Sequence, residues 1–145
     1  MSNFYRKLTQ GVLIAVSIFV AAPSTWAASF TINDGETVTA AQALVDGDTG
    51  LIVSGGFINS TAQGITISTL STGIAITNNG AITSVRDGIQ GPGGDNTGAI
   101  ATVINNGTIT TTGETGNADA VNFGGENGPT LILTNNGTIQ TLAID

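Results

Sequence analysis

The chain has 145 residues and few charges: 3 Lys+Arg and 10 Asp+Glu give a formal net charge of −7, and there is no cysteine or histidine. Without cysteine there are no disulfides and no thiolate metal site. Without histidine there is neither an imidazole zinc ligand nor a Ser-His-Asp triad. A chain of this length holds one domain or part of one.

Residues 1–27 are predicted to be a secretory signal peptide. Two basic residues precede an apolar run over residues 12–22, which is well short of the ~20 residues that a transmembrane helix needs. Thr25 and Ala27 place small residues at the −3 and −1 positions of a cut after Ala27. We therefore expect export across the inner membrane.

Cleavage after Ala27 changes the charge of the chain. One basic residue, Arg86, remains beside all ten acids, so the formal charge becomes 1 − 10 = −9. A single cation cannot neutralise a nucleic-acid backbone or hold the chain to an anionic lipid surface, so we expect neither as a partner. The only aromatic residues left are Phe30, Phe57 and Phe123.

From residue 29 onward the sequence is an internal repeat. A block containing Asn-Asn-Gly recurs three times, and a weaker copy precedes it. The shared glycines are Gly56, Gly80, Gly107 and Gly137. Their intervals are 24, 27 and 30 residues. A second landmark, a Gly-Ile or Ala-Val step, follows each of the first three glycines at residues 64–65, 88–89 and 120–121. The added residues lie in Gly-, Asn- and Pro-rich segments typical of turns.

Strands of three to six residues are expected between these turns, with aliphatic residues on one face and hydroxyl residues on the other. Two architectures fit: Asn-Gly hairpins, or an all-β right-handed parallel β-helix (β-solenoid) of about four coils. The interval and the three strands per unit favour the β-helix. It would also stack Asn78, Asn105 and Asn135 into a hydrogen-bonded ladder. Residues 28–51 would form the first coil or cap, and residues 52–145 the repeats.

The blocks around Asn78, Asn105 and Asn135, with the Asp-Gly-Ile and Asp-Ala-Val steps, resemble the passenger domains of Gram-negative autotransporters (type V secretion). The similarity covers roughly residues 29–142. The resemblance implies a downstream linker helix and a C-terminal translocator β-barrel, for which these 145 residues leave no room. We therefore expect an N-terminal passenger segment, truncated at its C-terminus, whose open last coil favours self-association.

Few residues are candidates for chemistry. The stretch Asp46-Gly47-Asp48 resembles half of a calcium loop but lacks the remaining ligands. Two glycine-rich stretches, residues 93–96 and 124–127, lack the spacing of calcium-binding repeats. The pair Arg86-Asp87 could serve a polysaccharide lyase, yet a solvated pair is the simpler interpretation. We predict no catalytic, cofactor-binding or metal-binding residue, and no cofactor.

The function expected from these observations is non-catalytic. By resemblance, the chain would serve in adhesion, autoaggregation or surface display. Its partners would be host or cell-surface carbohydrate or protein, or further copies of itself, with membrane contact only through a translocator barrel. It would lie at the cell surface in a full autotransporter, and otherwise in the periplasm or medium. The alternatives are a secreted polysaccharide-degrading β-solenoid and a pure spacer for a downstream domain.

Overall fold

A computed structural model describes residues 29–68, 70–94, 96–113, 118–124 and 128–142. All secondary-structure elements in these ranges are β-strands. The predicted signal peptide, residues 1–27, lies outside the described residues, as do parts of the two glycine-rich stretches. Because the described residues contain no helix, none of them forms a long apolar helix that could cross a membrane.

The strands follow one another in groups of three, one group per coil. The first two coils contain β1 (Phe30–Ile32), β2 (Thr37–Val38), β3 (Gln42–Leu44), β4 (Thr49–Ile52), β5 (Phe57–Ser60) and β6 (Ile65–Ile67). The next two contain β7 (Ile74–Asn78), β8 (Ala81–Ser84), β9 (Ile89–Gln90), β10 (Ile100–Asn105), β11 (Thr108–Thr111) and β12 (Val121–Asn122). A last group contributes β13 (Thr130–Asn135) and β14 (Thr138–Thr141).

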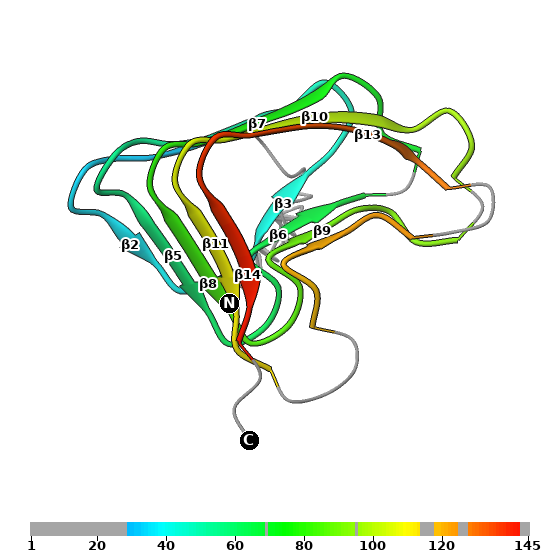
Figure 1. Ribbon diagram of the computed structural model, residues 1–145. Coiled ribbons are helices and arrows are strands. Elements are labelled where there is room, and N and C mark those ends of the chain that lie inside the picture. Colours follow the sequence, from blue (N-terminus) through cyan, green and yellow to red (C-terminus); the bar gives the residue numbers. More distant parts are fainter. Residues whose placement is uncertain (1–28, 69, 95, 114–117, 125–127, 143–145) are drawn as a thin grey trace, which may run out of the picture.

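Like strands of successive coils pair in parallel, which makes the molecule a β-solenoid. Three sheets result, with orders β1-β4-β7-β10-β13, β2-β5-β8-β11-β14 and β3-β6-β9-β12. We call them sheets A, B and C. In Figure 1, β7, β10 and β13 run side by side across the top, and β5, β8, β11 and β14 descend on the left. The predicted parallel β-helix of about four coils is confirmed, and the hairpin alternative is wrong.

The repeat glycines lie above one another, as a single winding axis requires. The N–H of Thr108 donates to the carbonyl of Gly80 at 3.0 Å, and the N–H of Thr138 donates to that of Gly107 at 2.9 Å. The second landmark stacks in the same way, because the N–H of Ile89 donates to the carbonyl of Ala120 at 3.1 Å. Residues added between coils are therefore accommodated outside these columns.

The core is a narrow interior filled by columns of aliphatic side chains. One column in sheet B consists of Ile58, Ile82, Ile109 and Ile139, aligned by strand register. The first three are fully buried and the last is partly buried. Alternation along each strand sends every second side chain inward, as predicted. Burial of these isoleucines is the main contribution that stabilises the stack.

One column contradicts the expectation that hydroxyl residues line only the outside. Ser60, Ser84 and Thr111 stack in sheet B and are buried. The chain turns a corner after each of them, which leaves backbone groups facing inward. The hydroxyls satisfy these groups: Ser60 accepts from the N–H of Ala62 at 3.1 Å, and Thr111 donates to the carbonyl of Ala118 at 3.1 Å. A buried hydroxyl with a partner costs little.

Candidate functional surfaces

The predicted asparagine ladder is present and runs through the interior of the solenoid. The Nδ2 of Asn78 donates to the Oδ1 of Asn105 at 2.7 Å, and the Nδ2 of Asn105 donates to the Oδ1 of Asn135 at 2.7 Å. Asn78 and Asn105 are fully buried. Their amides also donate to the carbonyls of Thr108 and Thr138, both at 3.1 Å, so the ladder ties sheet A to the turn that leads into sheet B.

A second ladder, which the sequence analysis missed, runs along the outside of the same turn. The Nδ2 of Asn106 donates to the Oδ1 of Asn79 at 2.8 Å, and that of Asn136 donates to Asn106 at 2.9 Å. Its donors point toward the first coil, whereas those of the interior ladder point toward the last. The signal was present in the second asparagine of each Asn-Asn-Gly block, which faces outward because neighbouring residues alternate.

The glycine of each block is required by close approach of the coils. A Cβ on Gly107 would lie 1.9 Å from the carbonyl oxygen of Gly80, and one on Gly137 would lie 2.0 Å from that of Gly107. Neither glycine has a positive φ, unlike Gly47 and Gly94. The hairpin interpretation of Asn-Gly assumed positive φ. The structure instead uses glycine because no side chain fits between stacked turns.

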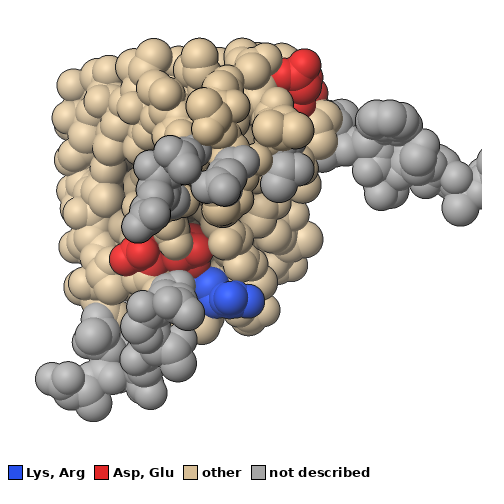
Figure 2. Space-filling view, turned by 90° about the vertical axis from the view of Figure 1, so that its right-hand side faces the viewer, with Lys and Arg blue, Asp and Glu red and all other residues tan. Residues whose placement is uncertain are grey.

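The Arg86–Asp87 pair is not arranged as an ion pair. Asp87 is 3% exposed, and its carboxylate accepts from the N–H of Asp119 at 3.0 Å and from the Nδ2 of Asn122 at 3.4 Å. Among the described residues, Arg86 has no carboxylate within 4.0 Å and is exposed. Figure 2 shows this single blue residue beside a red acidic group, with a second red group at the upper right of the same view. The Asp87 carboxylate thus joins two coils.

The acids of the calcium-like stretch stabilise a turn. Asp46 accepts from the backbone N–H and the hydroxyl of Thr72, both at 2.7 Å, and Asp48 accepts from the N–H of Val45 at 2.9 Å. The Thr72 hydroxyl, followed by its N–H, lowers the pKa of Asp46. Gly47 supplies the positive φ between the two acids. Within the described ranges, no three metal-ligating side chains gather at one place.

The glycine-rich stretch at residues 93–96 is likewise a turn in the part that is described. Asn96 is buried, its amide donates to the carbonyl of Gly93, and its Oδ1 accepts from the N–H of Leu70 at 3.1 Å. The second stretch, residues 124–127, lies outside the described residues from position 125 onward. Polar side chains here connect one coil to the next.

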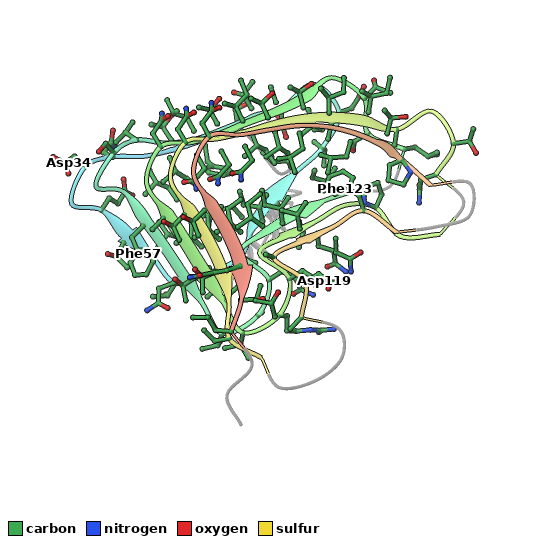
Figure 3. All side chains as sticks on the ribbon, in the orientation of Figure 1. Asp34, Phe57, Asp119 and Phe123 are labelled. Carbon is green, nitrogen blue, oxygen red and sulfur yellow. The ribbon has the colours of Figure 1, made fainter. Side chains whose placement is uncertain are left out.

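Two phenylalanines occupy columns in which the neighbouring coil has glycine. Phe30 is in register with Gly50, where a Cβ would lie 2.7 Å from the ring. Phe123 lies against Gly91 in the same way, with 2.7 Å to its Cδ1 (Figure 3). Both rings pack on the core. Each ring therefore fills the volume that the glycine leaves empty, near the first and last described turns.

The outer face of sheet A is the broadest regular surface. Its strands reach six residues in β10 and β13, and Thr77, Thr102 and Thr134 face outward beside Ile132. The columns mix threonine with aliphatic residues and contain no charge. Thr77 and Thr134 lie in one column with Ile104 between them, and Thr102 lies in the next column between Ala75 and Ile132, so hydroxyl groups alternate with aliphatic side chains across the face.

Comparisons of the chain with protein families, with curated proteins and with solved structures find no match. The parallel sheets place the chain in the class of parallel β-solenoids. Its function has to be argued from its own surfaces.

Proposed function

We propose that this chain is an exported, non-catalytic β-solenoid segment that is displayed at the cell surface and serves in adhesion or autoaggregation. The observation that carries the proposal is the use made of the polar side chains. Asn78, Asn105 and Asp87 are buried and bonded to the neighbouring coil. These amide and carboxylate groups, which could otherwise serve catalysis, bond one coil to the next and stiffen the stack.

The outer face of sheet A supports a binding role. Its threonines form weak, uncharged hydrogen-bonding groups in a flat array, and apolar side chains such as Ile132 lie among them. Carbohydrates present hydroxyls and apolar C–H patches, so they match this chemistry. Many weak contacts along a rigid surface can together give a useful binding affinity without a deep pocket. Once one contact has formed, the next sugar unit is held close to the surface, so each further contact forms at a high effective concentration.

Export is supported by the composition of residues 1–27, and the passenger role by the repeat. Of the Arg86–Asp87 pair considered for the competing enzymatic role, Arg86 is exposed and Asp87 is buried beneath the next coil. A single Arg, with no Lys or His after residue 27, is a meagre set for acid–base work on an acidic sugar.

The experiment produces the full chain in a Gram-negative host, then follows its location by fractionation and surface proteolysis. We expect a processed, exported protein, cells that settle or adhere faster, and purified chain that binds immobilised polysaccharide. Replacing Thr77, Thr102 and Thr134 by valine should weaken that binding. The matched control replaces Thr108 and Thr138, which face outward on sheet B, and should leave it unchanged.

Two results would overturn the proposal. One is retention of the unprocessed chain in the cytoplasm. The other is cleavage of the polysaccharide that disappears in Arg86→Gln, which would establish the enzymatic alternative. A chain that is exported but binds neither cells nor polysaccharide would favour the spacer role, and the adhesion part of the proposal would then be wrong.

A further inference from the structure

The described turns between sheets A and B contain Asn-Gly pairs, and this dipeptide carries its own reaction chemistry. The pairs are Asn79-Gly80, Asn106-Gly107 and Asn136-Gly137. In such a pair the backbone nitrogen of glycine attacks the side-chain amide carbon of asparagine, and the missing Cβ of glycine leaves the approach open. Because the dipeptide is the same in each turn, differences in reactivity have to come from the surrounding coils.

Asn79 is the member of the outer ladder whose amide nitrogen lacks an acceptor. Its Oδ1 accepts from Asn106 at 2.8 Å, whereas its Nδ2 has no hydrogen-bond partner among the described residues. The cause is Val53, which occupies the equivalent position one coil earlier. The N–H of Val53 donates to the carbonyl of Ile32 at 3.0 Å, and the N–H of Asn79 donates to that of Ile52 at 2.8 Å. A valine side chain accepts no hydrogen bond, so the outer ladder begins at Asn79.

The attacking nitrogen is also held differently in this turn. The N–H of Gly80 donates to the side-chain Oδ1 of Asn78 at 3.2 Å. The N–H of Gly107 donates instead to the backbone carbonyl of Asn78, in the coil before, at 3.1 Å. The nitrogen of Gly107 therefore has to leave a bond between coils before it can attack, whereas that of Gly80 has to leave only a bond to a side chain.

We propose that Asn79 is a site of spontaneous deamidation in the folded chain and that stacking of the coils protects Asn106. In the first step the nitrogen of Gly80 bonds to the Cγ of Asn79 and the bond from Cγ to Nδ2 breaks. The proton of the Gly80 amide leaves with Nδ2 as ammonia. Water then adds to one of the two carbonyl carbons of the succinimide ring and breaks its bond to nitrogen. The product is aspartate or isoaspartate at residue 79, and no group is oxidised or reduced.

Exposure alone predicts the opposite order of reactivity. Asn106 is exposed, whereas Asn79 is half-buried. Asn106 nevertheless has to release its Nδ2 from Asn79, and Gly107 has to release its N–H from the coil before. From the usual net strength of a hydrogen bond, these restraints should slow the reaction of Asn106 about tenfold relative to that of Asn79.

The direction of the ladder decides how the fold tolerates the aspartate product. At residue 79 a carboxylate still accepts from the Nδ2 of Asn106, and a charged acceptor strengthens that bond. At residue 106 a carboxylate would face the Oδ1 of Asn79, acceptor against acceptor. Asn79→Asp should therefore unfold at the same urea concentration as the parent or a higher one, and Asn106→Asp at a lower one. The inference does not rest on the proposed function, because it concerns only the chemistry of this turn.

The test incubates the purified chain in mildly alkaline buffer, with and without urea, and follows deamidation of its peptic peptides by mass spectrometry. In urea Asn79 and Asn106 should react at similar rates, because each precedes glycine. In buffer, where circular dichroism verifies the fold, Asn79 should react about tenfold faster than Asn106. Equal rates in buffer, or a faster reaction at Asn106, would overturn the proposal.

A substitution in the preceding coil isolates the cause. Val53→Asn supplies an amide oxygen at the position that the Nδ2 of Asn79 faces, and it should slow deamidation of Asn79 about fivefold without changing the rate at Asn106. Val53→Leu is the matched control, because leucine has nearly the shape of asparagine and no acceptor. Asn79 should react in this variant as in the parent. If both variants slow Asn79 alike, or neither does, the unpaired amide does not govern the reaction and the proposal is wrong.

Discussion

The interior asparagine ladder gives the sharpest test of how the coils are held together, because two adjacent residues belong one to the interior ladder and one to the outer ladder. Asn105 and Asn106 carry the same side chain, and each makes ladder bonds to the coil before and the coil after. Asn105 is fully buried, whereas Asn106 is exposed. Asn105→Ala and Asn106→Ala therefore remove the same chemistry in two environments.

The expected losses follow from the bonds and their access to water. Asn105 accepts from Asn78 at 2.7 Å and donates to Asn135 at 2.7 Å and to the carbonyl of Thr138 at 3.1 Å. Each such bond contributes about 1 kcal/mol, and partners left buried add to the cost, so Asn105→Ala should lower the free energy of unfolding by about 3 kcal/mol. At Asn106 water replaces the lost partners, and the loss should stay below about 1 kcal/mol.

The assay is urea unfolding of the chain without residues 1–27. It is followed by far-UV circular dichroism, because that chain has no tryptophan or tyrosine. Domains of this size are stable by roughly 5–15 kcal/mol, so a change of about 3 kcal/mol is readily measured. Equal losses for the two variants would refute the reasoning, since they would show that burial of the amide does not decide its contribution.

Further predictions concern the turns and the processing site. Gly107→Ala should abolish the cooperative unfolding transition, because its Cβ meets a backbone oxygen at 1.9 Å, whereas Gly93→Ala, which faces open space, should unfold like the parent. The Thr72 hydroxyl lowers the pKa of Asp46 in the folded chain. The ionised Asp46 carboxylate therefore stabilises the fold at pH values above its ordinary pKa of about 3.9, and this stabilisation is lost as the pH falls through the lowered pKa of the folded state. The parent should therefore lose stability in acid relative to Asp46→Asn, as thermal unfolding across pH 2–6 would show. Processing after Ala27 should give a purified chain with almost no absorbance at 280 nm, and a tryptophan band would contradict that site.

The winding of the chain could be predicted from sequence because its causes are local. Alternation along residues such as Ile74 to Asn78 determines which side chains face inward, and the recurrence of Gly80, Gly107 and Gly137 sets the length of a coil. Both properties are visible in one dimension. The interior ladder followed, since like residues at like positions must meet once coils stack.

Other features could not be predicted because they depend on the space and the unpaired backbone groups that a neighbouring coil or corner provides. Nothing near Phe123 in sequence indicates that Gly91, in another coil, provides the space for its ring. The burial of Ser84 and Thr111 depends on a corner in the chain that exposes backbone groups to the interior. Propensity alone places such hydroxyls outside.

The amino-acid sequence by itself determined the repeat, the alternation and the near-absence of basic residues after residue 27, and the first two of these predicted the parallel solenoid. Only the tertiary structure decided the roles of individual polar groups. In the folded chain Asn105 links neighbouring coils from a buried position and Asn106 links them from an exposed one, and the Asp87 carboxylate accepts a hydrogen bond from the next coil. The reason is distance along the chain: these partners are 27–32 residues apart and meet only after the coils stack, and their burial depends on atoms that no local pattern records.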